Sequence, residues 1–140
     1  MKKNSTTSLW DCIFFEFPAH HRDSAKLVAL SFPNEIPFRT KRLFFIESIN
    51  QEERGNHAHK VCNQFFVRTA GNVSLTCRDG ISEKTFNLSE INQGLFVPSG
   101  IWVNLKMGPF SSVAVLTDKQ YDERDYISEW QSFLQYKEIN

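Results

Sequence analysis

The sequence contains no apolar stretch that approaches the ~20 residues a membrane-spanning helix needs. Its first residues, Met1–Ser5, are basic, but the following run Leu9–Phe17 is interrupted by Asp11 and Glu16. No small-residue cleavage site follows a clean apolar run, as a secretion signal requires. We therefore expect a soluble protein that is not exported and does not bind a membrane.

The chain also lacks an excess of either charge, because Lys plus Arg and Asp plus Glu both number 16. No overall field would draw such a chain to nucleic acid or to an anionic membrane surface. We therefore expect neither as a partner. An anionic ligand has to be held by a local basic cluster.

Cysteines are few and odd in number: Cys12, Cys62 and Cys77. A chain of this size folds without disulfide bonds, and an odd count does not suggest a disulfide framework. The cysteine content therefore fits a reducing cytoplasm.

Linkers, low-complexity tracts and internal repeats are absent, and 140 residues is close to the commonest size of one domain. We expect a single domain over residues 1–140. Aromatic side chains are abundant, with 13 Phe, 3 Trp and 3 Tyr. Since aromatic residues pack well on pleated sheets, this composition favours β structure.

Short apolar or alternating runs, separated by turn residues, predict β-strands through most of the chain. The candidate strands are Cys12–Phe17, Leu27–Phe32, Lys41–Ile49, Gln64–Thr69, Val73–Cys77, Thr85–Leu88, Gly94–Val97, Trp102–Leu105 and Val113–Thr117. Asp79-Gly80 predicts the tight turn of a hairpin between Val73 and Leu88, because this dipeptide readily takes positive φ angles. Strands at this spacing indicate an all-β sandwich or barrel of the jelly-roll kind.

The pattern changes near the C-terminus, where apolar residues are spaced about three and four apart. They are Tyr126, Ile127, Trp130, Phe133 and Leu134. This spacing predicts one amphipathic helix over residues 121–137 that packs on the β structure.

His57 and His59 are separated by one residue, so on an extended strand both imidazole rings face the same side. That side is either the barrel interior or solvent. A pair of surface histidines is therefore the alternative to a functional site.

The neighbouring residues match the spacing of the two cupin motifs. The first motif is matched by Gly55, His57, His59, Gln64 and Gly71. The second is matched by Gly94, Pro98, Gly100 and Asn104, and its usual histidine falls at Val103. Together the half-motifs predict a cupin, a jelly-roll barrel that here carries a short C-terminal helix.

Two of the four usual metal ligands of these motifs are replaced, by Gln64 and by Val103. A catalytic transition-metal site generally needs at least three protein ligands, and a neutral amide replaces a carboxylate poorly. We expect neither a metal nor another cofactor. Two imidazoles in a partly apolar barrel favour acid–base chemistry instead, since a pKa of about 6.5 suits proton transfer near neutral pH.

A basic cluster accompanies the histidines. Arg54 precedes them directly, and Arg39, Lys41 and Arg42 come earlier in the chain. Guanidinium groups match phosphate oxygens well, so this cluster is a candidate diphosphate site. Solvated strand-edge charges are the alternative, above all for Arg39 and Lys41.

Several segments together resemble one known family. They are Ile36-Pro37-Phe38-x-x-Lys41-Arg42, Arg54-Gly55-x-His57-Ala58-His59-Lys60, Gln64, Asn92-x-Gly94-Leu95, Trp102 and Tyr121-Asp122-Glu123-x-Asp125-Tyr126-Ile127. From about Leu27 to Phe133 the chain resembles the dTDP-4-keto-6-deoxyglucose 3,4-ketoisomerases, also called sugar 3,4-oxoisomerases. The resemblance implies a metal-free barrel and a homodimer with exchanged N-terminal strands. It also implies a cytoplasmic role in making deoxy or amino sugars for surface polysaccharide.

The implied reaction moves the ketone of a dTDP-linked keto sugar from C4 to C3 through an enediol. His57 and His59 are the candidate proton carriers. Arg54 would stabilise the enediolate or hold a phosphate, and Gln64 would orient a hydroxyl or an imidazole tautomer.

The resemblance also suggests which residues bind the nucleotide sugar. Arg42 and Trp102 are the first candidates, and Lys41 and Asn104 are added to them. Trp102 is equally compatible with a place in the core.

The chain departs from the family pattern at two places. Phe44-Phe45 stands where family members carry Tyr-Tyr, and Ser24-Ala25-Lys26 stands where they carry Arg-Gly. One alternative is therefore that this protein differs from other family members in its substrate or in the stereochemistry of protonation at C4. His20 and His21, just upstream, are expected on the surface.

Three other functions remain open. The first is a nucleotide-sugar-binding cupin without turnover, and the second is a related isomerase or epimerase acting on another nucleotide sugar. The third is a metal-dependent cupin that uses His57, His59 and Gln64.

Overall fold

The fold is built almost entirely from antiparallel strands in the computed structural model, which describes residues 6–139. The strands are β1 Ile13–Glu16, β2 His20–Arg22, β3 Ala25–Leu27, β4 Arg42–Glu47, β5 Glu52–His59, β6 Gln64–Ala70, β7 Val73–Arg78, β8 Glu83–Leu88, β9 Gln93–Val97, β10 Trp102–Met107, β11 Ser112–Thr117 and β12 Tyr126–Ile127. Two short 3-10 turns, η2 Leu9–Asp11 and η3 Glu123–Asp125, and one helix, α1 Trp130–Tyr136, complete the described elements.

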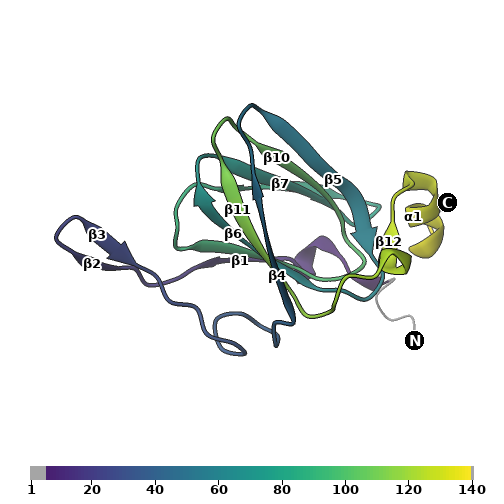
Figure 1. Cartoon of the computed structure of the whole chain (residues 1–140). Coiled ribbons are helices and arrows are strands. Elements are labelled where there is room, and N and C mark those ends of the chain that lie inside the picture. The colour runs from purple at the N-terminus through teal and green to yellow at the C-terminus, as the bar shows by residue number, and fades with distance from the viewer. Residues whose placement is uncertain (1–5, 140) are drawn as a thin grey trace.

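Two five-stranded sheets face each other (Figure 1). One has the order β1-β9-β6-β11-β4, and the other has the order β12-β5-β10-β7-β8. The core lies between them, with Leu95 and Val115 from the first sheet against Leu75 and Leu105 from the second. The predicted all-β jelly-roll arrangement of a cupin is confirmed.

The predicted hairpin from Val73 to Leu88 is present as β7 and β8. Alternate residues of β7 are buried, as expected for a strand with one face on the core. Gly80 has φ +101°, and the Asp79 carboxylate accepts hydrogen bonds from the amides of Ile81 and Ser82. The turn chemistry that the sequence predicted therefore closes this hairpin.

The strand predicted at Leu27–Phe32 is not formed. Instead, β2 and β3 make a separate two-stranded hairpin that projects from the body, and its residues are exposed (Figure 1). The chain after it runs irregularly, and Val28 and Leu30 pack on a cluster with Phe17, Ile36 and Phe65. The alternating apolar residues of this segment therefore pack on the face of a sheet and do not form one of its strands.

The C-terminal helix is shorter than the range 121–137 predicted. Tyr126 and Ile127 form β12, which pairs with His59 and Ala58 of β5, and α1 begins only at Trp130. The open edge of β5 offers backbone hydrogen bonds to this segment, so pairing prevails over a helical period. Between residues 6 and 139, no helix is long and apolar enough to cross a membrane.

Candidate active site

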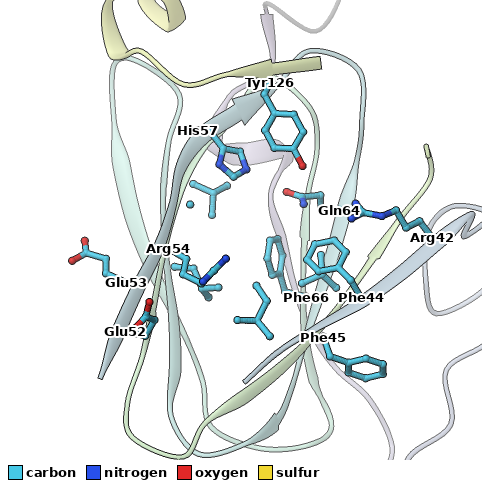
Figure 2. A pocket seen from close by; sticks show the side chains of 15 residues that line it. Arg42, Phe44, Phe45, Glu52, Glu53, Arg54, His57, Gln64, Phe66 and Tyr126 are labelled. Atoms are coloured by element: carbon cyan, nitrogen blue, oxygen red, sulfur yellow. The ribbon is translucent and has the colours of Figure 1, made fainter. Parts of the chain in front are cut away.

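A β-bulge in β5 determines which side chains reach the space between the sheets. His57 lies opposite Val103 and Gly55 lies opposite Asn104, so Asn56 is an extra residue in β5. Gly55 and Asn56 both have positive φ angles, 91° and 62°. A bulge shifts the alternation of a strand by one residue. Arg54 and His57 therefore point into the same cavity although they are three residues apart (Figure 2).

Gly55 is required at this bulge for two reasons. Its φ lies in the left-handed region, which residues with a Cβ adopt at a cost. A Cβ at this position would also lie 2.8 Å from the carbonyl oxygen of Val103 on the neighbouring strand β10. The glycine of the Arg54-to-His59 segment therefore serves the backbone that presents the histidine.

The cavity has a volume of about 610 Å³ and lies between β5, β10 and the strands β4, β6 and β11. Its apolar walls come from Phe44, Ile46, Phe66, Val103, Leu105 and Val115. Its polar groups include Arg42, Arg54, His57, Gln64 and Tyr126, while Glu53 points away from it (Figure 2). A cleft with apolar walls and convergent polar groups is typical of a small-molecule site.

His57 is half-buried and faces this cavity. Burial lowers its pKa to about 4, with a further contribution from nearby His59, and a hydrogen bond to the Gly55 backbone offsets part of this. The imidazole is therefore neutral at pH 7. A neutral imidazole has one nitrogen that accepts a proton, which is what a general base requires.

His59 is in edge contact with His57, at 5.2 Å between ring centroids, but does not line the cavity. Its Nδ1 is 2.8 Å from Oδ2 of Asp125, and both side chains are less than a tenth exposed. Among the described residues its Nε2 is buried without a hydrogen-bond partner. The two histidines therefore have different surroundings although they belong to one strand.

Asp125 is the centre of a buried hydrogen-bond network. Besides His59, it accepts hydrogen bonds from the backbone amides of Lys60 and Val61, at 3.0 and 2.7 Å. Burial alone would raise the pKa of Asp125, but the hydrogen bonds from His59 and Val61 outweigh it and lower that pKa. The ionised carboxylate only accepts, so Nδ1 of His59 carries a hydrogen.

Tyr126 packs against both histidines, which also contact each other. Its ring centroid is 4.8 Å from that of His57 and 4.4 Å from that of His59. Its hydroxyl points into the cavity toward the side of Gln64 and Arg42 (Figure 2). Burial raises the pKa of Tyr126, and Arg42 opposes this rise, so the phenol is protonated near neutral pH.

Of the basic residues considered, Arg42 and Arg54 line the cavity. The Arg42 guanidinium carbon is 4.6 Å from the centroid of the Phe44 ring, which orients it at the cavity wall. Arg39 and Lys41 are exposed and lie outside the lining. The cavity thus has two cationic groups on walls formed by different sheets.

The predicted binding residues Trp102 and Asn104 are also outside the cavity. Trp102 is buried against Trp130 and Phe133 of α1, at ring-centroid distances of 5.3 and 5.6 Å. The Asn104 amide donates hydrogen bonds to Glu53 and Asn56. Trp102 thus follows the core alternative left open by the sequence, and Asn104 supports the bulged strand.

Phe44 and Phe45 both border the cavity, but only the Phe44 side chain points into it. Strand β4 alternates, so Phe44 faces inward and Phe45 is 64% exposed and points outward (Figure 2). A tyrosine at position 44 would bring a hydroxyl to the cavity, whereas one at position 45 would face away from it.

Two residues at the site were not among the sequence candidates, Asp125 and Tyr126. Both lie in the Tyr121-to-Ile127 segment that supported the resemblance, but the helical spacing assigned them to a helix. The β-branched Ile127 beside Tyr126 is the one local signal for a strand. Their meeting with His59, 66 residues away in sequence from Asp125, is a tertiary contact.

One group of potential metal ligands is found among residues 6–139: His59, Cys62 and Asp125, with ligand atoms within 4.8 Å of one another. It includes neither His57 nor Gln64, the residues of the metal-dependent alternative. The Asp125 oxygens already accept three hydrogen bonds. Burial raises the pKa of Cys62 to about 11, so the thiol stays protonated. A metal at this position would have to deprotonate this thiol and displace hydrogen bonds of Asp125.

Comparison with known proteins places this site in a family. The family model FdtA, described as WxcM-like, C-terminal, matches residues 10–138. A TDP-4-oxo-6-deoxy-α-D-glucose-3,4-oxoisomerase of Aneurinibacillus thermoaerophilus is 35% identical over 114 residues, which cover 79% of this chain and 81% of that protein.

Two solved structures are similar over nearly the whole chain. A 3,4-ketoisomerase from Helicobacter canadensis has a TM-score of 0.87 and 29% identity, covering 91% of this chain and 98% of that chain. The TDP-quinovose 3,4-ketoisomerase WlaRB from Campylobacter jejuni has a TM-score of 0.83 and 27% identity, covering 89% and 98%. The family predicted from the sequence is thus confirmed, and the chain belongs to the sugar 3,4-ketoisomerases of the cupin fold.

Proposed function

We propose that the protein moves the ketone of a dTDP-linked 4-keto-6-deoxyhexose from C4 to C3. The observation that carries this proposal is a neutral His57 in an apolar cavity, with Arg54 and Arg42 on its walls. The oxoisomerase of A. thermoaerophilus, whose name gives TDP-4-oxo-6-deoxyglucose as its sugar, supports the same substrate class.

The chemistry requires a base next to C3. The C4 carbonyl acidifies the C3 hydrogen, so His57 removes it and leaves an enediolate. Return of the proton to C4 leaves the ketone at C3. One neutral imidazole is suited to both transfers because it accepts a proton and then returns it.

The cationic residues stabilise the charge that develops. Arg54 lines the cavity three residues before His57, where its guanidinium donates to the enediolate oxygen. Arg42, on the opposite wall, is the better placed of the two to hold the diphosphate. Gln64, which reaches the cavity between Tyr126 and Arg42 (Figure 2), orients a sugar hydroxyl.

We also propose a homodimer formed through the N-terminal part of the chain. The β2–β3 hairpin projects from the body, and its six strand residues are exposed. Leu43 and Phe45, on the outer side of the edge strand β4, are 52% and 64% exposed. A second copy that receives the hairpin would cover these apolar groups. The free cysteines Cys12, Cys62 and Cys77 support placing this dimer in the cytoplasm.

Incubation with dTDP-4-keto-6-deoxyglucose in deuterated buffer tests the activity. We expect a 3-keto product in proton NMR spectra, with deuterium at C4 when the base exchanges with solvent. Lys106→Gln, on an exposed position of β10, is the matched variant expected to behave as the wild type.

Absence of both product and deuterium uptake would contradict the isomerase with this sugar. The loss of a family tyrosine at Phe44 favours a second candidate, a nucleotide-sugar-binding cupin without turnover. Thermal stabilisation by the same nucleotide sugar, without exchange or product, would establish that candidate.

A further inference from the structure

The isomerisation moves a second hydrogen, which His57 does not account for. Besides the hydrogen that travels from C3 to C4, the hydroxyl on O3 loses a proton and O4 gains one. A group that serves both oxygens must donate a proton and accept a proton. The inference below rests on the proposed function and concerns this oxygen-bound proton.

Most polar groups around the cavity cannot perform this exchange. The guanidinium groups of Arg42 and Arg54 donate but do not accept, and the amide of Gln64 does not ionise near neutral pH. Glu53 points away from the cavity and accepts a hydrogen bond from Asn104, and the other lining carboxylate, Glu52, lies at the end opposite Tyr126 (Figure 2). Among the described lining residues, Tyr126 alone carries a hydroxyl.

The position of Tyr126 is held from several sides. Its backbone pairs with His59 in the β12–β5 ladder, and Asp125 next to it accepts three hydrogen bonds from β5 and the following turn. Its ring lies against both imidazoles, at 4.8 and 4.4 Å between centroids. The hydroxyl consequently enters the same end of the cavity as His57 and points toward Gln64 (Figure 2).

The opposite wall explains why this hydroxyl matters. Phe44 of β4 faces the cavity and has no phenolic oxygen, whereas Tyr126 reaches in from β12. Burial raises the pKa of Tyr126, so its oxygen retains a hydrogen until a neighbouring group takes it. Such a phenol is suited to donate to one oxygen while it accepts from another.

We propose that Tyr126 is a catalytic residue that relays the hydroxyl proton of the sugar from O3 to O4. As His57 removes the C3 hydrogen, the electrons of that bond form the C3–C4 double bond. The carbonyl pair moves to O4, which takes the Tyr126 proton. Tyr126 then takes the proton from O3, the C3 carbonyl forms, and C4 takes the proton from His57. Both residues end as they began, and no oxidant is needed.

The Tyr126→Phe variant tests the relay because it keeps the ring that packs on both histidines. In deuterated buffer, the NMR spectrum reports ketone migration and deuterium at C3 of the recovered substrate together. We expect turnover to fall about 100-fold with KM changed less than about threefold. His57 still removes and returns the C3 hydrogen, so the ratio of C3 exchange to product should rise at least about tenfold.

Tyr136→Phe is the matched control. Its hydroxyl donates a hydrogen bond to the Lys60 carbonyl, and Tyr136 does not line the cavity. We expect this variant to keep the wild-type ratio of C3 exchange to product. Thermal melts verify that both variants are folded.

An unchanged ratio in Tyr126→Phe, whether turnover falls or not, would overturn the relay while leaving the isomerase intact. A wild-type protein that neither exchanges nor isomerises would instead overturn the proposed function and the relay with it.

Discussion

Two histidines of one strand, packed against each other and against the same Tyr126 ring, have different surroundings. His57 faces a cavity with apolar walls and has no carboxylate partner, and its pKa is lowered to about 4. His59 is buried, and its Nδ1 is 2.8 Å from Asp125. Environments that differ in this way separate the roles of chemically identical groups. Of the two histidines, His57 alone lines the cavity.

Replacing the histidine on the cavity side should have the largest effect. His57→Asn removes the base but fills a half-buried position, so we expect turnover to fall about 1000-fold or more with the melting temperature nearly unchanged. Steady-state kinetics and thermal melts measure both. Full activity in this variant would show that the cavity side does not hold the base.

The buried side is tested through Asp125. In Asp125→Asn, the amide oxygen still serves the Lys60 and Val61 amides, which turns the side-chain NH₂ toward Nδ1 of His59. His59 then carries its hydrogen on Nε2. The ring of His59 lies 5.2 Å from that of His57 and contributes to its lowered pKa, so a change of tautomer alters the base. We expect turnover to fall about 30-fold to 100-fold and the ¹⁵N shifts of His59 to report the other tautomer.

Asp118→Asn is a matched control for the loss of a carboxylate. Asp118 accepts hydrogen bonds from the backbone and side chain of Asn63 and does not contact a histidine. Equal losses of turnover in the two variants would mean that Asp125 acts only by holding the fold.

The bulge in β5 is tested by Gly55→Ala. The added Cβ meets the Val103 carbonyl oxygen at 2.8 Å, and the positive φ strains the backbone. We expect a loss of about 1–3 kcal/mol in unfolding free energy and about a tenfold loss of turnover, since Arg54 and His57 shift together. Urea titration measures the first and kinetics the second. An unchanged protein would show that the bulge does not align these residues.

The lowered pKa of His57 predicts a pH dependence of stability. Between pH 6.5 and 4 the unfolded chain binds a proton at this residue, whereas the folded chain does not. Stability is therefore present above pH 6.5 and is lost as pH falls through this window. With a discount for partial exposure, the loss is about 2 kcal/mol.

Urea titrations of the wild type and His57→Asn at pH 7 and pH 4.5 isolate this contribution, because all other groups are common to both proteins. We expect the wild type to lose more stability than the variant on acidification. Parallel losses would place His57 in a solvent-like environment.

The smallest effect on the site is expected for Trp102→Phe. Trp102 packs on Trp130 and Phe133 and does not line the cavity. We expect KM for the nucleotide sugar to change less than about twofold and the unfolding free energy to fall by about 1–2 kcal/mol. A large rise in KM with unchanged stability would restore the nucleotide-binding role implied by the resemblance.

Much of the fold was predictable from local patterns. The alternation in β7 and the Asp79-Gly80 turn predict the hairpin, because a strand with one buried face has a period of two. The elements that the sequence did not predict have residue patterns that also fit another secondary structure. Tyr126 and Ile127 fit a helical period, but the free edge of β5 pairs with them. Leu27–Phe32 alternates as a strand does, yet its residues cover a sheet.

Part of the chemical content of the site follows from the sequence alone. The Arg54-to-His59 segment, Gln64 and the Phe44 departure are local features, so the family and the loss of two motif ligands are visible without a structure. A motif consists of residue types at a fixed spacing in the sequence, so it can be recognised whatever the tertiary structure is.

Which of these residues face the substrate is decided only by the tertiary structure. The bulge at Asn56 turns Arg54 toward the same cavity as His57, and β12 brings Tyr126 against both histidines and Asp125 against His59. These contacts join residues more than 40 positions apart, and His59 and Asp125 are separated by 66. Such contacts depend on strand pairing and register, and no local spacing specifies them.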